Sequence, residues 1–288
     1  MIAASDAVAP AYGPNALAST VEHIPVTVYA TSAQASKAVA QEIAALITLK
    51  AARGEKTVLG LATGSTPTSV YDELIRLHRE EGLSFKNVIT FNLDEYYPID
   101  PSSIQSYHRF MREHLFDHID IPPGNVNIPS GTIPQHKVAE HCQEYERRIK
   151  DAGGLDYQIL GIGRTGHVGF NEPGAPFDSR TRVVRLSEST RRVNAGDFES
   201  DRAPERAITV GMATIFESRE VLLLASGTNK AAAVAAAVEG PLTASCPASV
   251  LQLHPHATVV VDEAAAAMLE RADYYRYTLQ HKLPHQPY

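Results

Sequence analysis

The sequence is poor in cysteine and carries no excess of basic residues. Among its 288 residues only Cys142 and Cys246 are cysteines, and they form neither a disulfide framework nor a CxxC pair, which fits a reducing cytoplasm. We expect both to be ordinary small buried residues. The net charge of −7 provides no basic footprint for nucleic acid. An acidic chain can still bind a phosphate ester, but only locally, through backbone amides and one or two cations.

Long hydrophobic runs are missing as well. No segment reaches the roughly 18 apolar residues that a membrane span requires, so no membrane partner is expected. Residues 1–20 lack the basic region and the unbroken apolar segment of a signal peptide, and we expect a flexible N-terminal arm there. No internal repeat and no break in composition marks a second domain, so one domain is expected over residues 21–288.

What is present is an alternation of short apolar runs with longer, helix-like segments. Strands rich in Val, Ile and Leu, joined by connections long enough for helices, predict an α/β fold with a mostly parallel sheet and helices on both faces. Polar loops are expected after residue 92, and a C-terminal helix over 263–279. Ligands of such sheets bind beyond the carboxyl ends of the strands, so the loops there are the candidate site. The expected strands cover residues 24–30, 57–62, 88–92, 157–163, 206–211, 220–227 and 257–262.

The first strand-end loop is Thr63-Gly64-Ser65-Thr66, followed by Pro67. Thr66 is expected to cap the next helix, with Pro67 in its first position. Gly64 lets the backbone approach a ligand closely, and free amides at a helix start form an anion site. The alternative is a well-capped helix start that binds nothing. A Walker phosphate loop is excluded, because no Gly-Lys-Ser/Thr follows.

Two further loops carry titratable side chains. Asp94 and Glu95 follow the strand at 88–92, and adjacent residues on an extended chain point in different directions. One carboxylate can therefore face a pocket while the other pairs elsewhere; the alternative is a solvated acidic turn. His167 and Glu172 share a glycine-rich loop after the strand at 157–163. A neighbouring carboxylate holds the tautomer of an imidazole and raises its basicity, although a lone histidine is more often structural.

Lys230 stands in the first turn of a helix expected over 229–240. The helix dipole disfavours a cation at that position, which a bound anion would explain; the alternative is a plain exposed lysine. His114 and His118 have a spacing that zinc can use, but no third ligand is evident, so no metal site is predicted.

Five segments together resemble the glucosamine-6-phosphate deaminase (isomerase) family: LGLATGSTP, TFNLDEY, GIGRTGHVGFNEPG, LASGTNKAAAVAAAVEG and LQLHP, in that order, over about residues 25–265. The resemblance implies a Rossmann-like fold and conversion of glucosamine 6-phosphate and water to fructose 6-phosphate and ammonia. The enzyme would be a hydrolase of carbon–nitrogen bonds with a sugar-phosphate substrate and no metal or organic cofactor; a homo-oligomer is left open.

The resemblance also implies roles for individual residues. Asp94 would be the base that moves a proton between C2 and C1, and His167 with Glu172 would open the sugar ring. The phosphate would be bound by residues of two loops, namely Gly64, Ser65, Thr66 and Lys230.

The chain departs from the family pattern in three regions. Thr165 stands where the better-known histidine loop has an aspartate, although an Arg-Thr version resembles another branch of the family. The expected phosphate-binding arginine falls on Gly196, so Arg191 or Arg192 is a candidate substitute. We count Thr165 and Arg191 among the substrate contacts. Val184 and Arg185 alter the family's site for allosteric activation, and we expect that activation to be lost.

Two other functions compete with this interpretation. A 6-phosphogluconolactonase has a similar glycine-rich histidine loop, but here the histidine is followed by VGFNEP, and DEY is present. A non-catalytic sugar-phosphate sensor would require an output module, and no helix-turn-helix segment precedes the domain.

Overall fold

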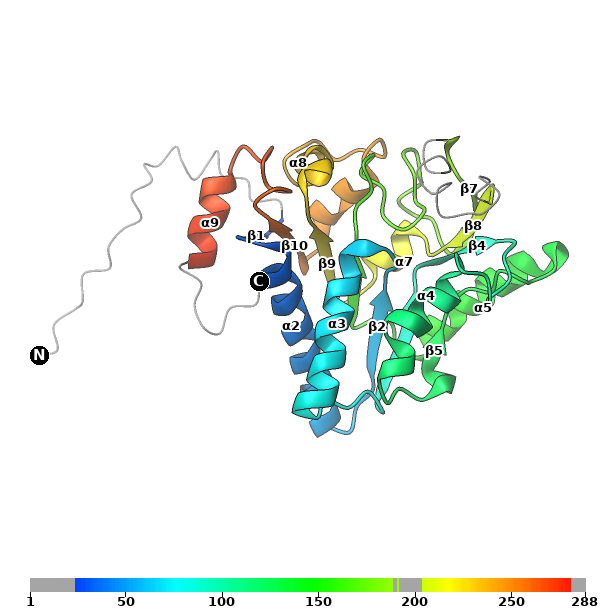
Figure 1. Ribbon diagram of the computed structural model, residues 1–288. Helices are drawn as coiled ribbons and strands as arrows, with labels where there is room; N and C mark the ends of the chain where they lie inside the picture. Colours follow the sequence, from blue (N-terminus) through cyan, green and yellow to red (C-terminus); the bar gives the residue numbers. More distant parts are fainter. Residues whose placement is uncertain (1–23, 189–190, 192–203, 281–288) are drawn as a thin grey trace, which may run out of the picture.

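In the computed structural model, which describes residues 24–188, 191 and 204–280, a seven-stranded parallel sheet forms the centre of the molecule (Figure 1). Its strand order is β1-β10-β9-β6-β2-β3-β5. The strands are β1 (Val26–Tyr29), β2 (Thr57–Leu61), β3 (Val88–Asn92), β5 (Val126–Asn127), β6 (Tyr157–Leu160), β9 (Glu220–Ala225) and β10 (Ala257–Asp262). The predicted α/β fold with a parallel sheet is thereby confirmed.

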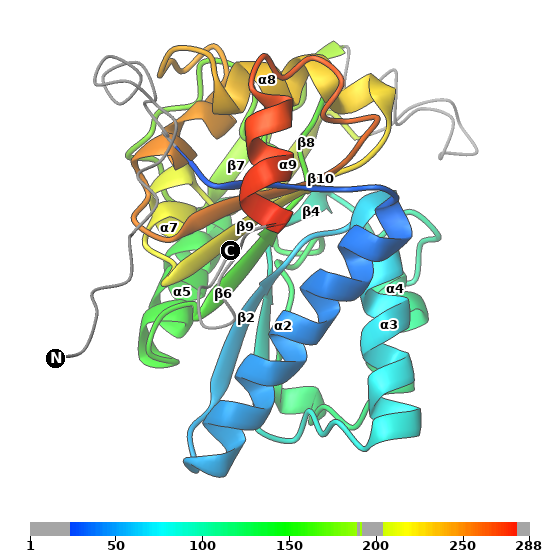
Figure 2. The ribbon, with the colours of Figure 1, turned by 90° about the vertical axis from the view of Figure 1, so that its left-hand side faces the viewer.

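Helices cover both faces of this sheet, as predicted (Figure 2). One face packs against α2, α3 and α4, and the other packs against α5, α7 and α8. The helices are α2 (Ser32–Ala52), α3 (Ser65–Glu81), α4 (Tyr107–His114), α5 (Val138–Asp151), α7 (Met212–Phe216), α8 (Ala231–Val238) and α9 (Ala272–Gln280). The described part of the chain also contains five 3-10 helices: η1 (Phe116–His118), η2 (Pro123–Asn125), η3 (Gln135–Lys137), η4 (Thr228–Lys230) and η5 (Pro247–Leu253).

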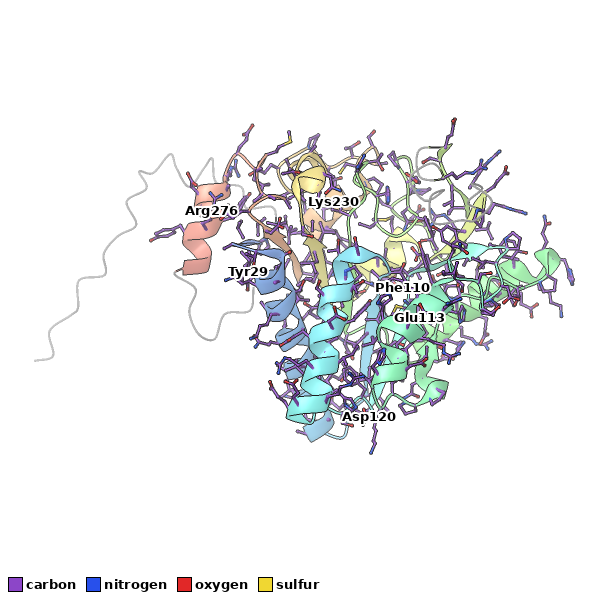
Figure 3. All side chains as sticks on the ribbon, in the orientation of Figure 1. Tyr29, Phe110, Glu113, Asp120, Lys230 and Arg276 are labelled. Atoms are coloured by element: carbon purple, nitrogen blue, oxygen red, sulfur yellow. The ribbon has the colours of Figure 1, made fainter. Side chains whose placement is uncertain are left out.

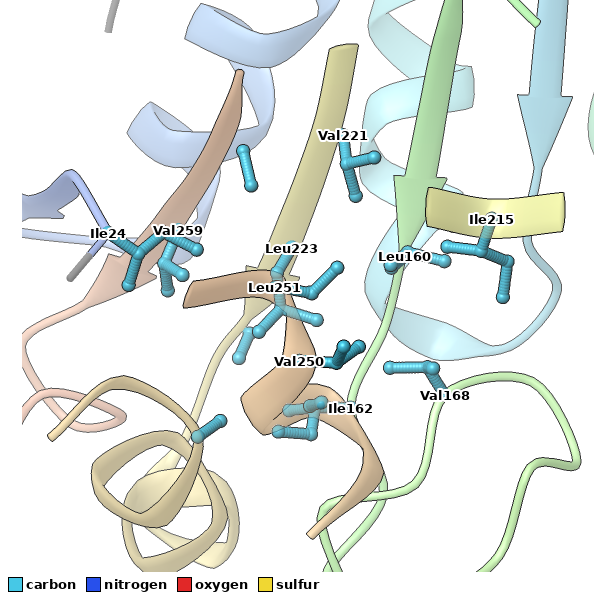
Figure 4. Close-up of a cluster of buried hydrophobic side chains, with 14 of the residues drawn as sticks. Ile24, Leu160, Ile162, Val168, Ile215, Val221, Leu223, Val250, Leu251 and Val259 are labelled. Carbon is cyan, nitrogen blue, oxygen red and sulfur yellow. The ribbon is translucent and has the colours of Figure 1, made fainter. Parts of the chain in front are cut away.

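The two-residue period of a strand divides the core into two layers. In β9, Val221 and Leu223 lie in the layer of α5 and α7, whereas Leu222 and Leu224 lie in the layer of α2 and α3. Figure 4 shows part of the first layer, where Leu223 lies near Leu251 of η5. Because both faces are buried, the longer strands are mostly apolar rather than alternating, and this pattern made them recognisable in the sequence.

A second, three-stranded antiparallel sheet was not predicted. It has the order β4-β8-β7 and is formed by β4 (Asp94–Tyr97), β7 (Arg182–Arg185) and β8 (Arg206–Thr209). The residues after the strand at 88–92 therefore continue as a strand, not as the expected polar loop. The strand predicted at 206–211 exists, but it belongs to this sheet and not to the parallel one. The small sheet positions Asp94 beside the carboxyl end of β3.

Two expectations about the chain ends have different outcomes. The C-terminal helix begins at Ala272, not at residue 263, because Asp262 accepts the amide of Ala265 and the residues that follow form turns. The expected arm at residues 1–20 lies outside the described residues, and the domain boundaries stay a prediction. Across the described segments, no helix combines the length and apolarity needed to cross a bilayer.

Candidate active site

Four neighbouring strands of the parallel sheet deliver the predicted loops to one place. The strands β9, β6, β2 and β3 are consecutive in the sheet, and their carboxyl ends lead to Lys230, His167, Gly64 and Asp94 respectively. These four residues line a single cavity of about 450 Å³. Figure 3 shows Lys230 at one end of the molecule and Asp120, which lies before β5, at the other. The loops predicted to form a site thus meet at the carboxyl edge, where parallel α/β sheets bind ligands.

The β2–α3 loop presents the start of a helix to this cavity. The helix α3 begins at Ser65, one residue after Gly64, whose φ of 109° is open only to glycine. The prediction that Thr66 caps the helix is wrong: Gly64 holds the cap position, no side chain among the described residues bonds there, and Pro67 is the third helical residue. Since Gly64, Ser65 and Thr66 all line the cavity, the first amides of α3 are available to an anion there.

Asp94 and Glu95 separate as expected from adjacent strand residues. Glu95 is fully buried and binds the start of α4, accepting hydrogen bonds from Ser106 Oγ (2.7 Å) and from the amides of Tyr107 (3.0 Å) and His108 (3.2 Å). Asp94 is 5% exposed and lines the cavity. Its burial, and secondarily the charge of Glu95, raise the pKa of Asp94 to about 8. A carboxyl group with such a pKa can take and return a proton near neutral pH.

The histidine loop closes directly over Asp94. Gly169 has a φ of 54°, and a Cβ at this position would lie 3.2 Å from Asp94 Oδ2. Earlier in the loop, a Cβ at Gly163 would overlap the ring of His167. Both glycines are therefore required by close approach, and they bring the backbone of the loop against both candidate catalytic side chains.

His167 has two partners on one ring nitrogen. Its Nδ1 lies 2.8 Å from Thr165 Oγ1 and 3.6 Å from Glu172 Oε2. Burial lowers the pKa of His167, the charge of Glu172 opposes this, and Lys230 adds to it. The imidazole is therefore neutral at pH 7, and Thr165 and Glu172 orient its ring from the Nδ1 side. Glu172 also accepts a hydrogen bond from Ser187 Oγ (3.2 Å).

Lys230 precedes α8, at the end of η4. Its ammonium donates to the carbonyl of Ile162 (2.7 Å), which fixes the side chain against the β6 loop. Burial, and secondarily the charge of Arg164, lower the pKa of Lys230. Lys230 thus lies at the amino end of α8, as predicted, but as its cap residue and not in its first turn.

Two predicted site residues, Glu172 and Arg191, are absent from the described cavity lining. Glu172 lies behind His167, 3.6 Å from its Nδ1. Arg191 instead has its guanidinium 3.7 Å from Glu205 Oε1. The alternatives Arg192 and Gly196 lie outside the described residues.

Two residues that line the cavity, Tyr107 and Arg164, were not predicted as site residues from the sequence. Tyr107 is the first residue of α4; burial raises its pKa well above the usual value, and its side chain hydrogen-bonds those of Tyr96 and Thr63. Nothing in its helical context distinguishes it from a core aromatic. Arg164 also lines the cavity. It lies within the motif that drew attention to His167, and its charge was a signal that could have been used.

One histidine of the candidate zinc pair is held by contacts within the protein. His118 contacts the carbonyl of Glu113 through Nε2 (2.8 Å) and Arg79 through Nδ1 (3.0 Å). Among the residues with described positions, no group of three or more His, Cys, Asp or Glu side chains is arranged to hold a metal ion.

Comparison with known proteins supports the resemblance seen in the motifs. The family profile of glucosamine-6-phosphate isomerases and 6-phosphogluconolactonases matches residues 30–261. The glucosamine-6-phosphate deaminase of Rhodococcus opacus (strain B4) is 52% identical over 227 residues, which are 78% of this chain and 87% of the relative. Glucosamine-6-phosphate deaminase 2 of Bacillus subtilis (strain 168) is 50% identical over 234 residues, which are 80% of this chain and 93% of the relative.

Solved structures agree. A monomeric glucosamine-6-phosphate deaminase superposes with a TM-score of 0.81 at 43% identity and covers 85% of this chain and all of that one. The 6-phosphogluconolactonase of Trypanosoma brucei has a TM-score of 0.69 at 21% identity over 85% of this chain and 98% of its own, a likeness that shows the fold alone. The chain therefore belongs to the family of glucosamine-6-phosphate isomerases and 6-phosphogluconolactonases.

Proposed function

We propose that this chain is a glucosamine-6-phosphate deaminase, acting in amino-sugar catabolism. The observation that carries the proposal is the convergence of Asp94, His167, Lys230 and the start of α3 on one cavity. Deaminases 50–52% identical to the chain over most of its length support this substrate over others of the family.

The phosphate of the substrate would bind between the start of α3 and Lys230. Both are positive features that face the same cavity, and a phosphate held there anchors the sugar away from its reacting carbons. That remote binding energy would position C1 and C2 against Asp94.

Ring opening would be the task of His167. The closed sugar has no acidic carbon proton, so its anomeric hydroxyl must first lose a proton while the ring oxygen gains one. A neutral imidazole, oriented by Thr165 and Glu172, can relay that proton and release the open-chain aldehyde.

Asp94 would then perform the isomerisation. The aldehyde at C1 acidifies the C2 proton, which Asp94 removes and returns to C1. Together with the passage of a proton from the amino nitrogen to the C1 oxygen, this transfer converts the aldose amine into a C2 imine. Burial keeps the carboxyl group basic enough for the transfer, because its pKa is raised to about 8.

Ammonia would leave by hydrolysis of that imine. Water adds at C2, the carbon–nitrogen bond breaks, and the products are fructose 6-phosphate and one ammonia. The reaction is thus an isomerisation that ends in a hydrolytic step, and in this sense the hydrolase assignment is proposed. Each step is a proton transfer or an addition of water at a carbonyl carbon or its imine.

The direct test is incubation of the protein with glucosamine 6-phosphate, measuring fructose 6-phosphate and ammonia in parallel. Equal amounts of both products are expected. Hydrolysis of 6-phosphogluconolactone without ammonia release from the amino sugar would favour the lactonase, and calorimetric binding without turnover would favour a sensor. The cytoplasmic location and an oligomeric state stay predictions.

A further inference from the structure

The cavity contains a second cation, Arg164, to which the family resemblance assigns no role. Arg164 lies in the loop after β6 and lines the cavity together with Lys230. No carboxylate lies within 4 Å of either side chain among the residues whose positions are described. Neither cation of this cavity therefore forms an ion pair with a described residue of the protein.

The backbone fixes where Arg164 is presented. The amide of Gly166 donates to the carbonyl of Gly163 (3.0 Å), and the amide of Gly163 donates to the carbonyl of His167 (2.9 Å). These bonds form a tight turn with Arg164 and Thr165 at its tip. Gly166 has a φ of 75°, and a Cβ there would overlap Cys246 Sγ, so only glycine permits this turn.

The positive charges of Arg164 and Lys230 repel each other. The positive charge of Arg164 lowers the pKa of Lys230, in addition to the larger effect of burial. Two cations that lie near each other without an ion-pair partner raise the free energy of the empty site. A ligand with two negative charges removes this repulsion, and a guanidinium matches the geometry of phosphate oxygens.

We propose that Arg164, acting with Lys230, is the second phosphate-binding cation of this site. The inference extends the proposed function: the histidine loop, and not the segment around Arg191, supplies the arginine. Arg191 lies near Glu205 and is absent from the described cavity lining, whereas Arg164 faces the cavity that the start of α3 also reaches. One loop would thus bind the phosphate through Arg164 and open the ring through His167.

The experiment compares Arg164→Gln, Arg164→Lys and a control, Arg53→Gln. Arg53 is exposed, lies at the end of α2 and precedes β2, so it belongs to the opposite edge of the sheet. Calorimetry measures the Kd for inorganic phosphate, and steady-state kinetics measure the KM for glucosamine 6-phosphate. Arg164→Gln should weaken both by about 10- to 100-fold with kcat within about threefold, and Arg164→Lys should recover much of the loss. Arg53→Gln should match the wild type.

A second measurement uses the unaltered chain. Phenylglyoxal modifies accessible guanidinium groups, and inorganic phosphate should slow the modification of Arg164, followed by mass spectrometry, while leaving that of Arg53 unchanged. Equal phosphate affinity in Arg164→Gln and wild type, or no protection of Arg164, overturns the inference. Phosphate binding that depends on Arg164 in a protein without deaminase activity would sustain the inference and refute the proposed function.

Discussion

The two ends of the central strands differ in how their buried charges are paired. At the amino ends of β6, β9 and β2, the buried carboxylate of Asp156 accepts from Lys50 Nζ (2.6 Å), Arg219 (2.9 Å) and the amide of Val58 (2.8 Å). At the carboxyl ends, Asp94 is just as buried, yet no cation pairs with it among the described residues. No described carboxylate lies within 4 Å of Lys230 or Arg164 in the same cavity.

The difference separates stability from function on the same strands. Asp156 is surrounded by its counter-charges, so its burial is compensated inside the protein. Asp94 is buried without a counter-charge from the described residues. Its burial raises its pKa to about 8, so that it can act as a base. The cations at the carboxyl edge, Lys230 and Arg164, which pair with no described carboxylate, are complementary to a substrate that carries a negatively charged group.

Replacing Asp94 by Asn should have the largest effect on activity. Removal of the base should lower kcat by about 10³-fold, because proton transfer at C2 loses its acceptor. Binding of the substrate, measured by calorimetry, should change by less than about tenfold. An unchanged kcat would remove Asp94 from the mechanism.

The same variant should not lose stability. A folded pKa raised above the unfolded value of 3.8 means that the native state holds its proton more tightly, so stability falls as pH rises from about 4 towards 8. The neutral amide escapes this penalty. At pH 8, Asp94→Asn should therefore unfold at a temperature equal to or a few degrees above that of wild type.

Replacing Asp156 by Asn should show the reverse pattern. This change leaves Lys50 and Arg219 without their shared carboxylate. It should lower the free energy of unfolding by about 2–3 kcal/mol. This is less than for a fully buried ion pair, because Arg219 is 60% exposed. Denaturant titration measures this, while kcat and KM of the folded protein should stay within twofold. A large loss of kcat would refute the division between the two edges.

Replacing Lys230 by Ala should raise KM for glucosamine 6-phosphate by about 10- to 30-fold, since a charge-assisted contact to the phosphate is lost. Lys37→Ala, an exposed lysine of α2, is the matched control and should leave KM unchanged. A normal KM for Lys230→Ala would move the phosphate site elsewhere.

Replacing Thr165 by Val should have a smaller effect, because it removes only the 2.8 Å contact to His167 Nδ1. We expect kcat to fall by about fivefold and Thr165→Ser to restore it. Thr165→Asp should raise the pKa of His167, followed by NMR titration of its imidazole, because a carboxylate favours the charged ring. A wild-type kcat in Thr165→Val together with an unchanged pKa of His167 in Thr165→Asp would show that Thr165 does not position the histidine.

The smallest expected change sharpens the account of Asp94. Glu95→Gln removes the charge that helps raise the pKa of Asp94, so the acid limb of kcat/KM should move to lower pH while the plateau rate stays similar. A limb that does not move would leave burial as the only cause of the shift.

The sequence predicted six strands of the parallel sheet because they are largely apolar on both faces. It did not predict the two-residue edge strand β5, which lies in a segment rich in proline and glycine. It did not predict the antiparallel sheet, because β4 reads Asp-Glu-Tyr-Tyr and its pairing with β8 joins residues more than a hundred positions apart. Thr66 was a plausible cap by residue preference, but the open backbone of Gly64 decided where α3 begins. The role of Arg164 required the fold, since only the turn over Gly163 and Gly166 shows where it faces.

The most direct test of the account follows the hydrogen at C2. With glucosamine 6-phosphate deuterated at C2, wild type should move the label to C1 or to solvent at the rate at which ammonia appears, and Asp94→Asn should do neither although it binds the substrate. Continued loss of the C2 label in Asp94→Asn would contradict the account.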